Sequence, residues 1–408
     1  MLGGTFLGNI GSYIYHLLMG RLLTTSDYGM LQSLISLSNI ISVPLTTLNT
    51  LMVKITSTYL GSQEEGKVAY LHHRLSSLFW RLLLIGGITF LLLKNFIFNL
   101  LHIDSFVSLV FLDIAIFFGL LQMLNRSVIQ GLARFMYYVA AHLIEAYGKL
   151  ILGIIAICLG LKAPGAFGAF VLSGTLTYLF TEVILRKILP GKEKQTRVNL
   201  GAFGQTTFYS FILTVSIIAL FNVDVVLVRH FLSSYESGLY AALSVLGKII
   251  YFGSAPIANT MLPLVTEAYA RKQNHHRIFL VSFILAVVVA GLITLIYGLF
   301  PDLSLKILIG VQYLEAAQYL FRFGIFLSLC ALLNLLGFFF YSVHEHTPLW
   351  FLVLAALIQA VGILFHHGSI GEVLTINLTV SASLFIVLLL YYVYVMRTQT
   401  AFGHRSRL

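Results

Sequence analysis

Long apolar runs follow one another along all 408 residues, and short connections rich in polar residues separate them. A run of about 20 apolar residues is long enough for a helix to cross the ~30 Å hydrocarbon core of a bilayer. This pattern predicts an all-α polytopic membrane protein with about twelve transmembrane helices. The expected helices are 2–23, 29–55, 79–101, 106–128, 135–160, 164–188, 205–230, 237–262, 278–300, 316–341, 348–366 and 373–396.

The composition supports the same class. Hydrophobic residues make up 59% of the chain and charged residues 10%, and the mean hydropathy is +0.93. Soluble domains carry about 25% charged residues, so this chain could not cover a water-facing surface.

The connections alternate in charge. One set is nearly free of Lys and Arg, and the other set, which includes the C-terminal tail, holds Lys67, Arg74, Arg126, Arg134, Arg186, Lys187, Lys192, Lys194, Arg197, Arg271, Lys272, Arg277, Arg397, Arg405 and Arg407. The positive-inside rule places the basic set, and with it both termini, in the cytoplasm. The net charge of +10 therefore reflects topology and contact with anionic membrane lipids, and it requires no nucleic acid.

A short motif occurs twice. GRLLTTSDYG at 20–29 is echoed by RHFLSSYESG at 229–238, with a Ser/Thr pair, an acid and a glycine at matching positions. The polar stretch KILPGKEKQTRV lies between the two copies and predicts a linker that divides the chain into lobes of six helices, 1–198 and 199–408. Both lobes then enter from the cytoplasm, as a parallel internal repeat of the kind found in transporters that rock two bundles. Chance similarity between two apolar segments is the alternative.

The repeated segments resemble a known family. MGRLLTTSDYGMLQSLISL resembles the first outer loop of the polysaccharide flippases, whose superfamily also contains the lipid II flippases and the multidrug-and-toxin extruders. FNVDVVLVRHFLSSYESGLYAALSVLGKIIYF resembles their seventh and eighth helices, and VIQGLARF, the Glu145–Lys149 region and GAFGAF are similar to helices four to six. The likeness spans roughly residues 15–345, and the chain has fewer spans than many relatives.

This resemblance implies a flippase of the cytoplasmic (inner) cell membrane. Its substrate would be an undecaprenyl-pyrophosphate-linked oligosaccharide, moved from the cytoplasmic to the outer leaflet by alternating access of the two lobes. Other polysaccharide-assembly proteins would be partners.

Ionisable residues inside the expected spans are the candidate site. Each costs at least a few kcal/mol in hydrocarbon, so each is a functional candidate. We expect substrate-binding bases at Arg21, Lys149, Arg229, Lys248 and Arg322, where the diphosphate needs its charge compensated. We expect charge pairing or ion coupling, with Na⁺ or H⁺, at Asp113, Glu145, Glu182 and Asp224.

Two of these acids have an expected partner. Glu145 and Lys149 are four residues apart on one helix and share a face. Asp224 and Lys248 lie on either side of the second motif, at similar depth, and we expect them to pair across the hairpin.

Other function classes fit less well. No G-x-x-x-x-G-K-[ST] motif for an ATP-driven pump occurs, and the loose His344-Glu345-His346 cluster is weak support for a metal site, so we expect no cofactor and no enzyme. A membrane-embedded polysaccharide polymerase or ligase would need a larger external loop than any here. A cation extruder of the same superfamily stays open, but it would favour acids without matching bases.

Overall fold

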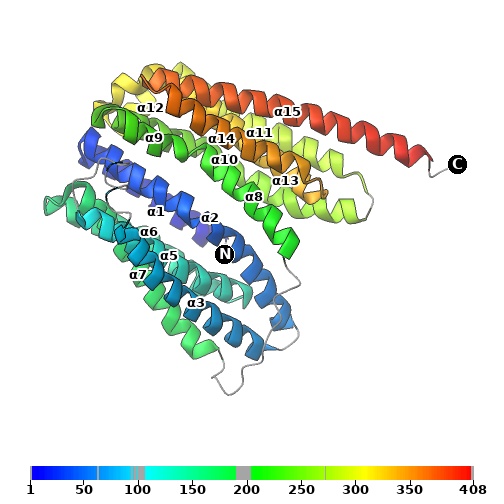
Figure 1. Ribbon diagram of the computed structural model, residues 1–408, viewed down its shortest axis with the longest axis horizontal. Coiled ribbons are helices and arrows are strands. Elements are labelled where there is room, and N and C mark those ends of the chain that lie inside the picture. Colours follow the sequence, from blue (N-terminus) through cyan, green and yellow to red (C-terminus); the bar gives the residue numbers. More distant parts are fainter. Residues whose placement is uncertain are drawn as a thin grey trace. The chain divides into compact units, whose positions relative to one another are not determined.

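The computed structural model describes residues 2–61, 64–92, 106–189, 204–271 and 273–405, together with Asn95 and Asn99. Every regular element in these ranges is a helix (Figure 1). The elements are α1 (Leu2–Leu22), α2 (Thr25–Gly61), α3 (Glu65–Leu92), α5 (Phe106–Gly131), α6 (Phe135–Cys158), α7 (Lys162–Ile188), α8 (Gly204–Leu220), α9 (Val223–Phe231), α10 (Ser234–Ala270), α11 (His275–Leu299), α12 (Pro301–Leu308), the 3₁₀ helix η3 (Val311–Ala316), α13 (Ala317–Ser342), α14 (Thr347–Phe365) and α15 (Ile370–Arg405).

The helices lie where the apolar runs predicted them. Within the described ranges, nine helical segments from α5 onward are long and apolar enough to cross a bilayer. α1 and α2 coincide with the first two expected spans, and α3 covers the described part of the third. The chain is an all-α multi-pass membrane protein, as predicted.

The expected span 205–230 is broken into two helices. α8 ends at Leu220 and α9 begins at Val223, with Asn222 in a non-helical conformation between them. The Asn222 side-chain amide donates to the carbonyl of Ile218 at 2.9 Å. Asparagine competes for backbone hydrogen bonds in this way, and Asp224 in the first turn of α9 favours a new helix N-terminus there. Hydropathy alone did not reveal the break.

The connection between the expected spans 278–300 and 316–341 is also helical at its start, PDLSLK. Pro301 occupies the first turn of α12 with Asp302 beside it, and both residues favour a helix start. A loop was expected at this position.

The chain divides into two compact units. Unit 1 is Met1–Phe211 with Ser233–Ala241, and unit 2 is Ile212–Leu232 with Ala242–Leu408. The boundary expected between residues 198 and 199 lies outside the described residues.

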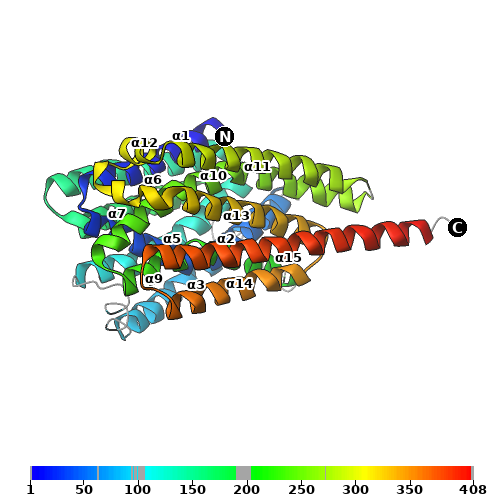
Figure 2. The ribbon, with the colours of Figure 1, turned by 90° about the horizontal axis from the view of Figure 1, so that it is seen from above.

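In unit 1, α5, α6 and α7 pack side by side, with α1 along α6 and α2 along α5 (Figures 1 and 2). Glycines let α1 approach α6 closely: a Cβ on Gly4 would clash with Val139, and one on Gly8 would clash with the ring of His142. Small residues at helix interfaces play this part in membrane proteins.

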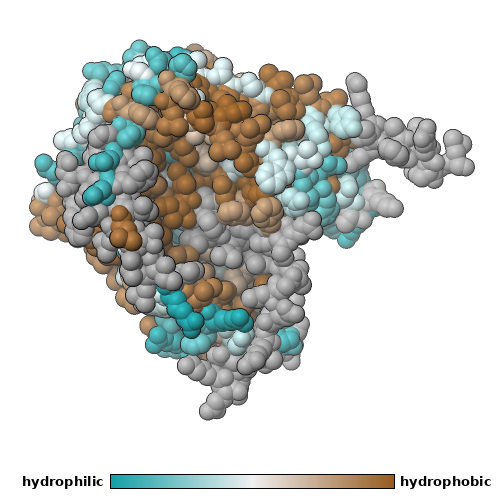
Figure 3. Space-filling model, viewed as in Figure 1, coloured by the Kyte–Doolittle hydropathy of each residue, from teal (hydrophilic) through white to brown (hydrophobic). Residues whose placement is uncertain are grey.

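In unit 2, α13 is packed between α11 and α15. Phe279, Phe339 and Tyr392, one from each helix, form an aromatic cluster with ring centroids 4.5–5.2 Å apart. Large apolar side chains such as Leu357 and Leu390 are more than half exposed on α14 and α15. The viewed face over these two helices is largely apolar (Figure 3), as a lipid-facing surface requires.

Each copy of the repeated motif begins a 37-residue helix, α2 or α10. The Thr24 hydroxyl donates to the Asp27 carboxylate at 2.7 Å and accepts from the Asp27 backbone N–H at 3.2 Å. Ser233 and Glu236 make the same two bonds at 2.7 and 3.2 Å. The motif is therefore a helix-capping box, in which a side chain satisfies a backbone donor of the first turn.

Candidate functional site

A cavity of about 310 Å³ lies inside unit 1, between α2, α5, α6 and α7. α2 contributes hydroxyl and amide side chains to its lining, and α5, α6 and α7 contribute aromatic and small residues. Its charged lining residues are Arg126 and Glu145.

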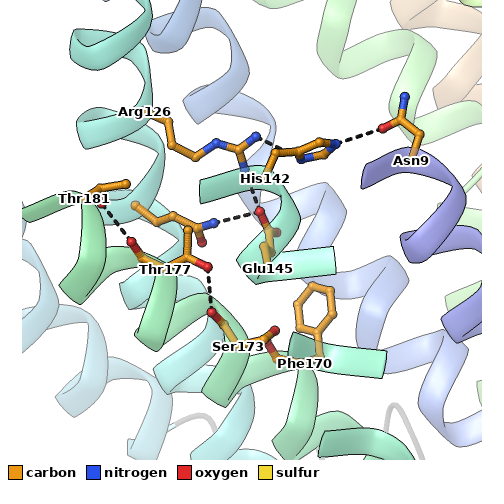
Figure 4. Close-up of polar contacts among 9 residues, drawn as sticks. Asn9, Arg126, His142, Glu145, Phe170, Ser173, Thr177 and Thr181 are labelled. Carbon is orange, nitrogen blue, oxygen red and sulfur yellow. Dashed lines mark hydrogen bonds and ion pairs between the residues drawn. The ribbon is translucent and has the colours of Figure 1, made fainter. Parts of the chain in front are cut away.

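These two residues form an ion pair across α5 and α6 (Figure 4). Arg126 Nη1 lies 2.5 Å from Glu145 Oε2, and both side chains are mostly buried. Gln122, one turn before Arg126 on α5, donates its amide to the same Oε2 at 2.8 Å. The Arg126 guanidinium therefore neutralises this carboxylate, and the Gln122 amide helps to hold it.

His142 extends the network to α1 (Figure 4). Arg126 Nη2 lies 3.1 Å from His142 Nδ1, and His142 Nε2 lies 3.1 Å from Asn9 Oδ1. A guanidinium can only donate, so Nδ1 must be the acceptor. His142 is therefore the neutral tautomer whose Nε2–H donates to Asn9.

Lys149 lies outside this cavity lining. It is 6% exposed, and its Nζ lies 5.7 Å from the ring centroid of Tyr15 and 5.5 Å from that of Phe170. Among the described residues no ion pair joins it to Glu145, whose partner is Arg126. The four-residue spacing allowed the expected pair, but Arg126 on α5 lies closer to the carboxylate.

The other two acids of unit 1 belong to different contacts. Glu182 on α7 accepts from Arg186 Nε at 2.9 Å and from the Asn125 amide at 3.2 Å. Asn125 Oδ1 in turn lies 2.7 Å from His72 Nε2, which ties α3, α5 and α7 together. Asp113 faces α3, where a Cβ on Gly87 would lie 3.3 Å from its Oδ2.

Unit 2 holds a second polar cluster at the start of α9. Asp224 is 1% exposed, and it accepts from the Val225 backbone N–H at 2.9 Å and from the Asn377 amide at 3.2 Å. Gln359 on α14 donates to Asn377 Oδ1 at 2.7 Å and to the Leu220 carbonyl at 2.9 Å. α9, α14 and α15 thus meet around one buried carboxylate.

Lys248 reaches the same helix break. Its Nζ donates to Asn222 Oδ1 at 3.1 Å, and it lies 5.9 Å from the ring centroid of Phe221. Within the described ranges no ion pair of 4.0 Å or less joins Lys248 to Asp224. The two residues share the hairpin as expected, with the lysine bonded to the amide of Asn222 instead.

The other three basic candidates lie on α1, α9 and α13. Arg21 is exposed at the end of α1, whereas Arg229 is buried at the end of α9. Arg322 on α13 donates from Nη2 to Thr375 Oγ1 of α15 at 2.8 Å.

The sequence reasoning missed four residues of the unit 1 network. Asn9, Gln122 and His142 were not singled out, and Arg126 was counted with the basic cytoplasmic connections. One signal was present in the sequence. Gln122 and Arg126 are spaced by four on one helix, and His142 and Glu145 by three on the next, which places a polar stripe on each.

The side chains of the cluster His344-Glu345-His346, before α14, make other contacts. Within the described part of the chain, no group of three His, Cys, Asp or Glu side chains is placed to hold a metal ion. Glu345 instead accepts from the Tyr391 hydroxyl at 3.1 Å. Burial and the neighbouring His344 lower the pKa of His346 below its usual value.

The fold recurs in solved transporter structures, although no protein-family model and no curated protein sequence matches the chain. An inward-facing multidrug resistance MATE family transporter of the MOP superfamily superposes with a TM-score of 0.70 at 15% identity, over 97% of this chain and 96% of that one. The lipid II flippase MurJ, in an inward closed conformation, gives 0.66 at 12% identity, over 97% and 86%.

A third structure, a MOP superfamily transporter from Pyrococcus furiosus described as having a binding pocket of reverse polarity, gives a TM-score of 0.57 at 15% identity, over 96% and 92%. These likenesses cover 96–97% of this chain and 86–96% of the matched chains. The protein therefore has the fold of the MOP superfamily transporters.

Proposed function

We propose that this protein is a membrane transporter that moves an undecaprenyl-pyrophosphate-linked oligosaccharide from the cytoplasmic to the outer leaflet of the cell membrane. The likeness of nearly the whole chain to transporters, a lipid II flippase among them, carries the proposal. The resemblance of the repeated segments to polysaccharide flippases supports the substrate class. The proposal contains no catalytic step.

Movement would occur by alternating access of the lobes 1–198 and 199–408, with both termini in the cytoplasm and other polysaccharide-assembly proteins as partners. Lys149, Lys248 and Arg322, with Arg21 and Arg229, are our candidates for compensating the diphosphate charge. Asp224, buried beside the Asn377 amide, is our candidate for coupling to Na⁺ or H⁺. Membrane potential would supply ~2.3 kcal/mol per charge per 100 mV.

The cavity electrostatics favour this substrate over an organic cation. A cation extruder needs an acid that is free to bind its ligand. Glu145 is already bonded to Arg126 and Gln122, so a cation would have to displace both donors.

A second candidate is extrusion of organic cations. The likeness to a multidrug MATE transporter supports it as well as the likeness to MurJ supports flipping. Glu145 would then be the cavity acid.

One reconstitution separates the two candidates. Purified protein is placed in liposomes containing a polyprenyl-pyrophosphate-linked oligosaccharide with a fluorescent label on its glycan, and a membrane-impermeant quencher reports the outer-leaflet fraction. We expect quenching to go to completion with protein, and to stop at the outer-leaflet pool in protein-free liposomes. Ethidium uptake under a Na⁺ or pH gradient is measured in parallel. Ethidium transport without glycolipid movement would reject the flippase proposal.

A further inference from the structure

The α2 wall of the unit 1 cavity carries hydrogen-bonding side chains without charge. Ser38, Asn39, Ser42 and Asn49 all line the cavity. Ser38, Ser42 and Asn49 lie on one helix face, because spacings of four and eleven residues return close to the same direction at 3.6 residues per turn. The facing α5–α6 wall differs from it, because that wall carries the charged lining residues Arg126 and Glu145.

The hydroxyl of Ser38 has no hydrogen-bond partner among the described residues, although Ser38 is only 8% exposed. Two other serines on α2 are satisfied: Ser33 donates to the Gly29 carbonyl at 3.0 Å, and Ser42 donates to the Asn39 carbonyl at 3.0 Å. A buried hydroxyl without a hydrogen-bond partner destabilises the folded protein. Because Ser38 lines the cavity but its Oγ is itself buried, a ligand in the cavity reaches this hydroxyl after the side chain rotates about χ1.

The charged wall is neutral as a whole. Arg126 and Glu145 compensate each other, and Gln122 completes the contact. Neither a free cation nor a free anion would meet an uncompensated charge on this wall. The ligand part that fits here is therefore uncharged and polar.

Aromatic rings complete the lining. Phe118, Tyr138 and Phe170 line the same space as the α2 hydroxyls and amides. A sugar ring has matching chemistry, with apolar C–H faces and hydroxyl or acetamido groups around its edge. At about 310 Å³ the cavity is at the small end of ligand pockets, which suits a small part of a glycan.

We infer that the unit 1 cavity is a glycosyl subsite, in which Ser38 and its α2 neighbours hydrogen-bond a sugar of the lipid-linked substrate while the diphosphate binds elsewhere. This inference deepens the proposed function and rests on it. It makes Ser38 a determinant of glycan recognition.

The test compares two probes and two serines. The probes are a water-soluble short-chain prenyl pyrophosphate that carries one N-acetylhexosamine, and the same prenyl pyrophosphate without the sugar. The variants are Ser38→Ala and the matched control Ser36→Ala. Ser36 is also buried on α2 without a partner among the described residues, but it does not line the cavity. Dissociation constants and the melting temperature without ligand are measured for the full chain in nanodiscs.

We expect Ser38→Ala to weaken binding of the glycosylated probe about fivefold, as for loss of one hydrogen bond, and to leave the unglycosylated probe unchanged. The melting temperature without ligand should stay the same or rise, because an unpaired polar group is removed. Ser36→Ala should change neither affinity. Asn49→Ala, on the same face of α2, should act as Ser38→Ala does.

Equal weakening of both probes, no change for the glycosylated probe, or a fall in melting temperature with Ser38→Ala would each overturn the subsite. Failure of the proposed function gives a different result, in which the wild-type chain binds neither prenyl probe but binds ethidium.

Discussion

Gly29 and Gly238 hold the same place in the two copies of the repeated motif, and they pack against each other within unit 1. A Cβ on Gly29 would lie 2.7 Å from the backbone nitrogen of Gly238, and one on Gly238 would clash with the carbonyl of Thr25. The first turns of α2 and α10 therefore meet backbone to backbone. The glycine of the motif serves this contact, and the Ser/Thr and acid serve the cap.

Gly238→Ala should destabilise the protein by about 1–3 kcal/mol, because the new methyl meets backbone that cannot rotate away. Thermal unfolding in detergent measures the change. The matched control is Gly253→Ala on the same helix, where a Cβ would meet, among the described residues, only an Ile293 methyl at 3.8 Å. Gly253→Ala should be neutral or stabilising by about 0.5–1 kcal/mol. Equal losses from both substitutions would contradict the close backbone contact.

Arg126→Gln and Glu145→Gln should each destabilise the protein, because each leaves a mostly buried charge without its partner. The double variant should lose less than the sum of the two single losses. We expect a coupling of about 0.5–3 kcal/mol from a double-mutant cycle in thermal or denaturant unfolding. Arg134→Gln, an exposed arginine nearby, serves as the control and should be silent. Strict additivity would show that the pair contributes nothing to stability.

The hydrogen-bond pattern of His142 fixes its tautomer. ¹⁵N spectra of protein labelled at histidine, assigned by comparison with His142→Gln, should show His142 with Nδ1 unprotonated and Nε2 protonated. Replacement of Asn9 by Ala should shift the Nε2 signal and leave the Nδ1 signal in place, because Arg126 still donates to Nδ1. A signal of a doubly protonated ring would exclude the Arg126 contact.

Lys149→Gln, Lys248→Gln and Arg322→Gln, made singly, should reduce export of surface polysaccharide while protein abundance stays normal. Each removes a positive charge that the diphosphate would need in hydrocarbon. Lys67→Gln is the control, since Lys67 is ion-paired with Glu64 outside the expected spans. Full export by all three variants would reject charge compensation by these residues. Loss of protein together with export would instead assign them a role in holding helices together.

Topology follows from the charge alternation. Reporter fusions at Lys192, Gln273 and Thr400 should report cytoplasm, and fusions at Ser234 and Gly368 should report the outside. A cytoplasmic signal at Ser234 would overturn both the orientation and the parallel repeat.

The spans were predictable because the length of an apolar run is a property of local sequence. The ion-pair partner of each charged side chain was not predictable, because it depends on which helices become neighbours. Helical spacing allowed Glu145 to pair with Lys149, but only the packing of α5 on α6 brought Arg126 to the carboxylate. Ser38 had no sequence signal at all, because an unpaired hydroxyl is recognised only when its surroundings are known. The break at Asn222 was hidden for a related reason, as its flanking residues are apolar on both sides.

The break between α8 and α9 also affects the order in which unit 2 folds during synthesis. α9 has nine residues and is ~14 Å long, too short to cross the ~30 Å hydrocarbon core alone. Backbone groups freed between α8 and α9 need partners inside the membrane. One of them, the carbonyl of Leu220, is bound by Gln359, which lies 139 residues further along the chain. We therefore expect the seventh span, α8 with α9, to reach its final structure only after α14 has been synthesised.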